Sequence, residues 1–302
     1  MKLAAAELRE RSEQGAALLD ECALCPRRCA VDRNAQETGR CGVGRFAVVA
    51  SLGPHFGEEP PLVGTRGSGT VFFSGCNMDC VFCQNYDISH DARGAQASPE
   101  DLAAAFMKIQ SLGCHNLNLV TPTHVTPQIL EGLSLAVEQS FSLPIVYNCG
   151  GYESVETLRL LDGVVDIYMP DMKYGDDEAA LELSGVPDYV SRSRAAAKEM
   201  WRQVGDLVIG RDGLAERGLL IRHLVLPENA ARSEEVYRFL SERLSKDTYL
   251  NIMDQYRPAG RLDRIGRPCM KRPLRTEEVV SSAEKARSFG LWRGFSTVGV
   301  TW

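Results

Sequence analysis

The sequence lacks the features of a membrane, secreted or nucleic-acid-binding protein. No apolar run reaches the roughly 18 residues that a helix needs to span a bilayer. The first residues form a charged stretch rich in Ala, Glu and Arg, without the apolar segment of a secretion signal. Lys and Arg number 34 against 40 for Asp and Glu, and the formal net charge of -6 disfavours a general nucleic-acid surface. We therefore expect a cytoplasmic protein that binds neither nucleic acid nor membrane.

Cysteine, by contrast, is abundant, with ten residues in the chain. Because the cytosol keeps thiols reduced, so many cysteines indicate metal or redox chemistry rather than disulfides. Most of them fall into two groups along the sequence. We expect each group to form a site of its own.

The central group follows an apolar, β-branched run at residues 69–73, which predicts a buried strand that ends near Gly75. Cys76, Cys80 and Cys83 then follow in a C-x3-C-x2-C spacing. This spacing lets one short loop wrap three corners of an iron–sulfur cube. A closed electron-transfer cluster normally takes four thiolates, so a set of three predicts one iron left open for a substrate or cofactor.

The second group lies nearer the N-terminus, after a helix expected over residues 2–20. It comprises Cys22, Cys25, Cys29 and Cys41, in a Gly-, Arg- and Asn-rich stretch with little propensity for regular structure. Four thiolates in this interval can close a zinc or a [4Fe–4S] site, and a segment with few apolar residues would need such a staple. The sequence does not decide between the two metals. An accidental grouping of unligated cysteines is the alternative.

After the central loop, strand patterns alternate with helix patterns. We expect strands at residues 116–120, 143–147, 164–169, 219–226 and 249–253. We expect helices at residues 98–112, 126–140, 154–161, 178–208 and 233–244, and one that starts at Thr276. Strands that alternate with helices imply a parallel sheet. Six such units, counted from the strand before the central loop, predict an α/β fold, a partial (β/α)6 barrel of the TIM type.

The chain is accordingly divided into three parts: an N-terminal helix and four-cysteine segment at 1–50, a strap or linker at 51–66, and the barrel at 67–302. A strand is expected at residues 46–52, just before the strap. Pro60 and Pro61 argue against a helix in the strap, so we expect an extended lid there. Glu58 is a candidate to contact the substrate, together with Glu59, and a solvated pair is the alternative.

The carboxyl ends of the predicted strands carry polar side chains. Chemistry in parallel barrels gathers at these ends. The polar residues there are His124, Asn148, Asp171, Lys173, Arg222, Gln255 and Tyr256. Their recurrence at one end of successive apolar strands predicts an active site, in which His124, Gln255 and Tyr256 are further candidates for substrate contact.

The central loop resembles the signature of the radical S-adenosylmethionine (radical SAM) family, with Phe82 directly before the third cysteine. The resemblance is greatest with relatives of the pyruvate formate-lyase activating enzyme and covers most of residues 66–257. It implies that Cys76, Cys80 and Cys83 hold a [4Fe–4S] cluster and that S-adenosylmethionine chelates the open iron. It also implies that Phe82 lies beside the adenine.

Further strand ends resemble the same family. Asp171-x-Lys173 is similar to its fourth-strand Asp-x-Lys, which implies contact with the ribose and carboxylate region of the cofactor. Arg222 resembles a fifth-strand arginine that approaches the cofactor, where a guanidinium suits a carboxylate because the pair is bidentate and permanently charged. Asn148 stands where the family has an aspartate. The family's Gly-Gly-Glu after the second strand is replaced here by residues 122–124.

The resemblance implies reductive cleavage of S-adenosylmethionine. An electron from a flavodoxin or ferredoxin would enter the cluster, and a 5′-deoxyadenosyl radical would abstract hydrogen from a substrate. Two reactions stay open: installation of a glycyl radical on a partner protein, and radical modification of a small molecule or peptide. A non-catalytic iron–sulfur electron carrier is the alternative class, although a carrier has no need of the polar strand ends.

Overall fold

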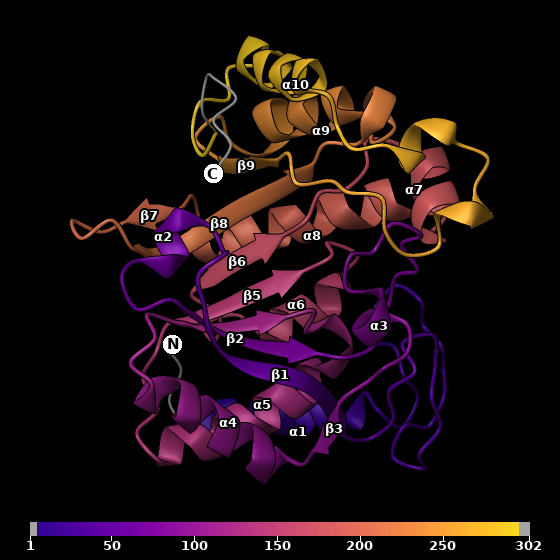
Figure 1. Ribbon diagram of the computed structural model, residues 1–302. Coiled ribbons are helices and arrows are strands. Elements are labelled where there is room, and N and C mark those ends of the chain that lie inside the picture. The colour runs from indigo at the N-terminus through magenta and orange to yellow at the C-terminus, as the bar shows by residue number, and fades with distance from the viewer. Residues whose placement is uncertain (1–4, 296–302) are drawn as a thin grey trace.

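The computed structural model describes residues 5–295 and shows a mostly parallel sheet flanked by helices (Figure 1). The strands in this part of the chain are β1 (Ala47–His55), β2 (Ser68–Phe73), β3 (Ala95–Ala97), β4 (Leu117–Val120), β5 (Ile145–Cys149), β6 (Ile167–Pro170), β7 (Val208–Ile209), β8 (Ala215–Leu224) and β9 (Tyr249–Met253). Strands β2, β4, β5, β6, β8 and β9 pair in parallel in that order. The predicted α/β fold with a partial barrel of six parallel strands is thus confirmed.

The α-helices of residues 5–295 lie around this sheet. They are α1 (Ala5–Ala17), α2 (Pro60–Val63), α3 (Tyr86–Ser89), α4 (Pro99–Ser111), α5 (Thr126–Glu138), α6 (Val155–Leu160), α7 (Asp177–Ser184), α8 (Tyr189–Val204), α9 (Ser233–Phe239) and α10 (Thr276–Ser288). Helix α4 begins at a capping box, in which Ser98 accepts from the backbone N–H of Asp101 and the Asp101 carboxylate accepts from that of Ser98. This reciprocal cap satisfies donors that the first helical turn leaves free. A π-helix at Leu240–Leu244 continues α9.

The longer helical region expected over about residues 178–208 is interrupted, and its expected end is wrong because α8 ends at Val204. The structure has two helices there, α7 and α8, separated by a turn at Gly185. Gly185 has a left-handed backbone, with φ of 62°, which ends α7 because glycine adopts this conformation without a Cβ penalty. The break matters for the site because α8 then begins at Tyr189, whose hydroxyl contacts two strand ends.

The expectation of an extended strap without a helix is also wrong. Strand β1 runs on to His55, and Pro60 and Pro61 open the single-turn helix α2. Proline is tolerated in a first helical turn because the N–H it lacks has no partner there. Leu62 of α2 is fully buried against Val146, Met169 and other apolar side chains of the barrel interior. Helix α2 therefore closes the end of the barrel at which the parallel strands begin (Figure 1).

The remaining strands extend the sheet beyond the barrel. Strand β1 pairs antiparallel with β2, and β3 pairs antiparallel with β1. Strand β7 pairs antiparallel with β8. The outward side chains of the sheet, among them Leu119, Tyr147 and Tyr168, are fully buried beneath the helices. The inward-facing side chains line the barrel, and several of them are polar.

The N-terminal segment lies against the barrel rather than apart from it. Helix α1 packs on α5, and the chain from residue 18 to 46 has little regular structure. Arg33 donates to the carbonyls of Gly44 and His124, and Thr157 donates to the carbonyl of Leu24. The bond to His124 fixes the segment to the residues that follow β4, and the bond from Thr157 fixes it to α6. Across residues 5–295, none of the helices combines the length and the apolar character needed to cross a bilayer.

Candidate active site

The three central cysteines lie on the loop that leaves β2. The turn into this loop is made at Gly75, whose φ is 82°. A Cβ atom there would overlap the carbonyl oxygen of Cys41, so only glycine allows the N-terminal segment to pack this closely. The loop thus starts from a fixed point at the end of a buried strand.

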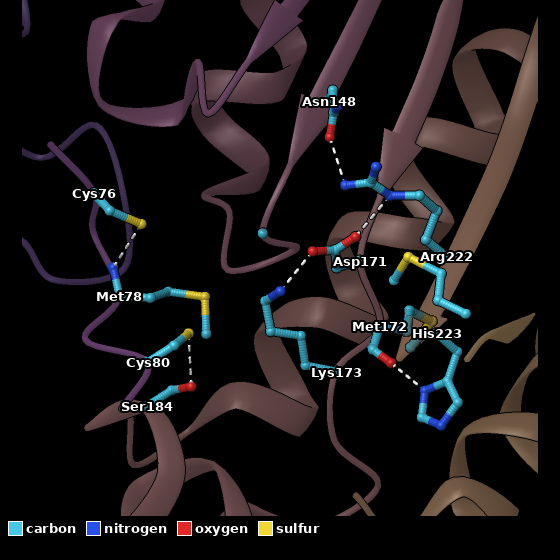
Figure 2. A network of polar contacts seen from close by, with 12 residues as sticks. Cys76, Met78, Cys80, Asn148, Asp171, Met172, Lys173, Ser184, Arg222 and His223 are labelled. Atoms are coloured by element: carbon cyan, nitrogen blue, oxygen red, sulfur yellow. Dashed lines mark hydrogen bonds and ion pairs between the residues drawn. The ribbon is translucent and has the colours of Figure 1, made fainter. Parts of the chain in front are cut away.

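Each central thiol has a polar neighbour. The Ser184 hydroxyl lies 2.9 Å from Cys80 Sγ and donates to it. The backbone N–H of Met78 donates to Cys76 Sγ at 3.4 Å (Figure 2). Cys83 Sγ lies 3.2 Å from the Ser89 hydroxyl. Hydrogen bonds to sulfur suit thiolates that carry metal.

The central thiols also lie close enough to affect one another. Burial raises the pKa of Cys80 to about 11, and the nearby Cys83 adds to this shift. Burial likewise raises the pKa of Cys76, and Cys80 and Cys83 raise it further. A metal must therefore displace the protons when it binds. Three soft thiolate donors on one loop, next to the buried cation of Lys173, fit an anionic iron–sulfur cluster.

A buried charged network begins beside this loop and crosses the ends of three strands (Figure 2). Lys173 Nζ lies 2.5 Å from one carboxylate oxygen of Asp171, and Arg222 Nε lies 2.8 Å from the other. Arg222 Nη2 donates to Asn148 Oδ1 at 2.7 Å. Burial raises the pKa of Asp171, but the charges of Arg222 and Lys173 outweigh it and hold that pKa below its ordinary value. The structure therefore brings together the four cofactor-site residues predicted from the strand ends.

Neighbouring residues hold this network in place. The Tyr189 hydroxyl accepts from the backbone N–H of Lys173 and lies 2.8 Å from the carbonyl of Asp171 and 3.0 Å from that of Gly150. The ring of His223 is fully buried and donates from Nδ1 to the carbonyl of Met172 at 2.6 Å. Burial lowers the pKa of His223 to about 4, so the ring is neutral at pH 7.

The two strap glutamates reach the same network. Their side chains are only 8% exposed for Glu58 and 5% for Glu59, and each carboxylate lies 3.9 Å from Arg222 Nη1. Burial raises the pKa of Glu58, although Arg222 opposes the shift. Asn251 donates to Glu59 Oε1 at 2.9 Å. The pair is therefore buried rather than solvated, and a role for Glu58 in substrate contact stays a prediction.

Sequence reasoning missed Asn118 and Asn251 and gave Glu59 only a minor role. Both asparagines lie in otherwise apolar strands, and Asn118 is fully buried. A buried amide within an apolar strand is the signal that could have revealed them. Glu59 Oε2 and Asn118 Oδ1 are buried and have no hydrogen-bond partner in residues 5–295.

The other substrate candidates lie apart from this network. His124 is buried, its Nε2 donates to the carbonyl of Ser74 at 2.8 Å, and burial lowers its pKa to about 4. Tyr256 is buried and donates to the carbonyl of Met270 at 2.6 Å. Gln255 is exposed, and its Nε2 lies 3.6 Å from Met253 Sδ. A role for these three in substrate binding stays a prediction.

Phe82 and the N-terminal cysteines complete the set of predicted residues. Phe82 is buried, with its ring centroid 6.1 Å from that of Tyr256 in an edge-to-face arrangement. The N-terminal thiols line one common cavity, and they belong to Cys22, Cys25, Cys29 and Cys41. Within the described range, no three Cys, His, Asp or Glu side chains are arranged to grip a single metal ion.

Comparison with known proteins assigns the class. Residues 70–240, more than half of the chain, match the Radical SAM superfamily. The chain belongs to this superfamily, whose members use a [4Fe–4S] cluster and S-adenosylmethionine. Over 284 residues it is 31% identical to the uncharacterized protein MJ0674 of Methanocaldococcus jannaschii, covering 91% of this chain and 76% of that protein.

Two solved structures are also similar. One is TYW1 with a lysine-pyruvate adduct bound, at 12% identity and a TM-score of 0.45, covering 72% of this chain and 73% of the other. The second is HydG, a maturase of the [FeFe]-hydrogenase, at 11% identity and a TM-score of 0.44, covering 95% of this chain and 63% of the other.

Proposed function

We propose that this protein cleaves S-adenosylmethionine reductively and directs the resulting radical at a small molecule or peptide held inside the barrel. When bound, the cluster and S-adenosylmethionine supply a 5′-deoxyadenosyl radical that abstracts hydrogen. The observation that carries the proposal is the charged network from Lys173 through Asp171 to Arg222, which runs from the central loop across the strand ends. A ligand held at that loop would extend along this network.

The residues of the network have separate tasks. Lys173 and Arg222 place two positive charges where the carboxylate of a bound amino-acid group would need them. Asp171 lies between them and keeps both side chains oriented. Phe82 offers an apolar edge beside the loop for a flat ring.

The buried side chains near the strap favour a substrate that donates hydrogen bonds. Buried acceptors without a donor are costly, and Glu59 Oε2 and Asn118 Oδ1 are two such acceptors in residues 5–295, with the Glu59 carboxylate 3.9 Å from Arg222. A substrate with N–H or O–H groups would satisfy them. An electron carrier of the alternative class would gain nothing from buried acceptors at this point.

The central test is production of 5′-deoxyadenosine by the anaerobically reconstituted, dithionite-reduced protein. We expect the wild type to produce it and Cys80→Ala to produce none, because two thiolates hold a cube poorly. Cys269→Ala, outside both cysteine groups, is the matched control and should retain activity. Wild-type amounts from Cys80→Ala would contradict the proposal.

The role of Arg222 is tested by binding. Arg222→Lys keeps the charge but loses the forked geometry that bonds Asn148 and Asp171 together. Loss of one charge-assisted hydrogen bond corresponds to about 1.5–3 kcal/mol, or roughly ten- to a hundredfold weaker binding of S-adenosylmethionine. Arg232→Lys on the surface should bind as the wild type does. Equal affinity in all three proteins would remove Arg222 from the cofactor site.

The finer assignment, an activating enzyme that installs a glycyl radical on a partner protein, predicts a different product. A reaction on a small molecule or peptide leaves deuterium from a labelled substrate in 5′-deoxyadenosine without any second protein. Installation of a glycyl radical leaves a persistent electron paramagnetic resonance signal on a partner protein. Mass spectrometry and that spectrum therefore separate the two. A flavodoxin or ferredoxin is the proposed electron donor in both.

A further inference from the structure

The cavity behind the central loop is lined by more than thiols. Its wall includes the four N-terminal cysteines and the side chains of Arg27 and His124. Arg27 Nη2 is buried and has no hydrogen-bond partner in residues 5–295. His124 Nε2 carries the ring proton because it donates to a carbonyl, so Nδ1 keeps a lone pair, and this atom too is buried without a partner in the same range. The cavity wall thus contains an N–H group of Arg27 without an acceptor and a ring nitrogen of His124 with a free lone pair. Both lie beside the four cysteine sulfurs, which are soft metal ligands.

The charge of this region is also unbalanced. Arg33 is only 1% exposed, yet its guanidinium bonds solely to carbonyl oxygens and forms no ion pair with a carboxylate in residues 5–295. Arg27 donates to the carbonyl of Asn77 and lies over the ring of Tyr152, again without a carboxylate in that range. Buried cations are normally paired. A metal centre with four thiolates is negatively charged, so it would supply the anionic partner that Arg27 and Arg33 do not find among the carboxylates of residues 5–295.

The cavity shares a wall with the central loop. The carbonyl of Cys41 packs against Gly75, the residue before Cys76. Arg27 Nε donates to the carbonyl of Asn77, the residue after Cys76, at 2.8 Å. His124 bonds to Ser74 at the end of β2. Two short routes, each with a single non-covalent contact, therefore join the N-terminal thiols to the backbone on either side of Cys76.

From these observations we infer that Cys22, Cys25, Cys29 and Cys41 hold a second [4Fe–4S] cluster, which passes electrons to the central one. The N–H of Arg27 would donate to a sulfur of this cluster, and the positive charges would favour its reduced, more negative state. A structural zinc ion would need closed coordination but no contact with a redox centre. The shared wall therefore favours the cluster.

The transfer balances as a one-electron reaction. A flavodoxin- or ferredoxin-class donor is oxidised by one electron as the second cluster is reduced. The same electron then moves to the central cluster, and the second cluster returns to its oxidised state without any bond being made or broken. The cluster itself stands independently, whereas its role as a relay rests on the proposed function.

The presence of the cluster is tested by metal content after anaerobic purification. We expect about eight irons per chain in the wild type and about four in Cys25→Ser/Cys29→Ser. Cys114→Ala, a buried cysteine outside both groups, should retain about eight. About four irons and one zinc in the wild type would overturn the inference. If the double variant does not fold, Cys76→Ala/Cys80→Ala/Cys83→Ala should retain about four irons with a [4Fe–4S] spectrum, and the absence of iron there would overturn it equally.

The relay is tested by comparing reductants. Cys25→Ser/Cys29→Ser should lose most 5′-deoxyadenosine production driven by reduced flavodoxin, at least tenfold, and much less of that driven by dithionite. Arg27→Met should lower the midpoint potential of the second cluster, whereas the exposed Arg28→Met should not. Equal losses with both reductants would overturn the relay. Failure of the wild type to form 5′-deoxyadenosine with either reductant would instead contradict the proposed function, and iron content would still decide whether the second cluster exists.

Discussion

Replacing Asp171 with asparagine removes the charge that links the two cations of the site. Asp171 is 8% exposed, and its carboxylate is the one that pairs with Lys173 in residues 5–295. Without the Asp171 charge, Arg222 still has the carboxylates of Glu58 and Glu59 at 3.9 Å, whereas Lys173 loses its carboxylate partner. The destabilisation therefore arises mainly at Lys173. Removing one partner of a buried ion pair leaves the other charge uncompensated and lowers the free energy of unfolding by about 3–5 kcal/mol. Because an amide oxygen still accepts a hydrogen bond, we expect a decrease of about 3 kcal/mol in the free energy of unfolding.

Urea denaturation of the metal-free protein under reducing conditions measures this decrease. Asp171→Asn/Lys173→Met removes the stranded charge as well and should recover part of the loss, with a coupling free energy of about 0.5–3 kcal/mol. Asp162→Asn, which breaks the exposed pair with Arg202, should cost at most about 1 kcal/mol. If the effects of Asp171→Asn and Lys173→Met simply add, the two side chains are not coupled and the reasoning is refuted.

Three further substitutions test the surroundings of the site. Gly75→Ala places a Cβ against the N-terminal segment at a φ of 82°, whereas Gly113→Ala meets only the strain of a φ of 75°. We expect the first alone to lower iron content, and equal iron in both would contradict this. Burial raises the pKa of Glu153 to about 7 from 4.5, so the folded state holds its proton more tightly and the free energy of unfolding should fall as pH rises between these values. Glu153→Gln should flatten that decline in urea titrations across the range, and an unchanged slope would contradict the shift. Ser184→Ala removes the donor 2.9 Å from Cys80 Sγ and should lower the midpoint potential of the central cluster in a redox titration, which an unaltered potential would refute.

Local patterns in the sequence were sufficient for the parallel strands and the central loop. The strand at residues 249–253 was predicted to the residue, and the four cofactor-site residues at strand ends meet in one network. The strand and the proximity of these four side chains could be predicted for the same reason, whereas their role in cofactor binding stays a prediction. A buried parallel strand is a continuous apolar run, and its carboxyl end lies at a known edge of the sheet.

Contacts between distant segments could not be predicted in this way. The helix break at Gly185 depends on one backbone conformation, and α2 forms because Leu62 finds a place inside the barrel. Asn251 of β9 donates to Glu59, which lies 192 positions earlier in the chain. Composition and periodicity describe each segment alone, so they carry no information about such meetings.

The tethers of the N-terminal segment also impose an order on biosynthesis. Arg33 bonds to a residue 91 positions later, and Leu24 bonds to one 133 positions later. At a synthesis rate of about 5–20 residues per second, these partners emerge on the order of 10 seconds after the segment does. The N-terminal cysteines are therefore synthesised well before the residues that later cover them, and they stay exposed in the meantime. During that interval their thiols are open to oxidants as well as to the machinery that delivers iron and sulfide.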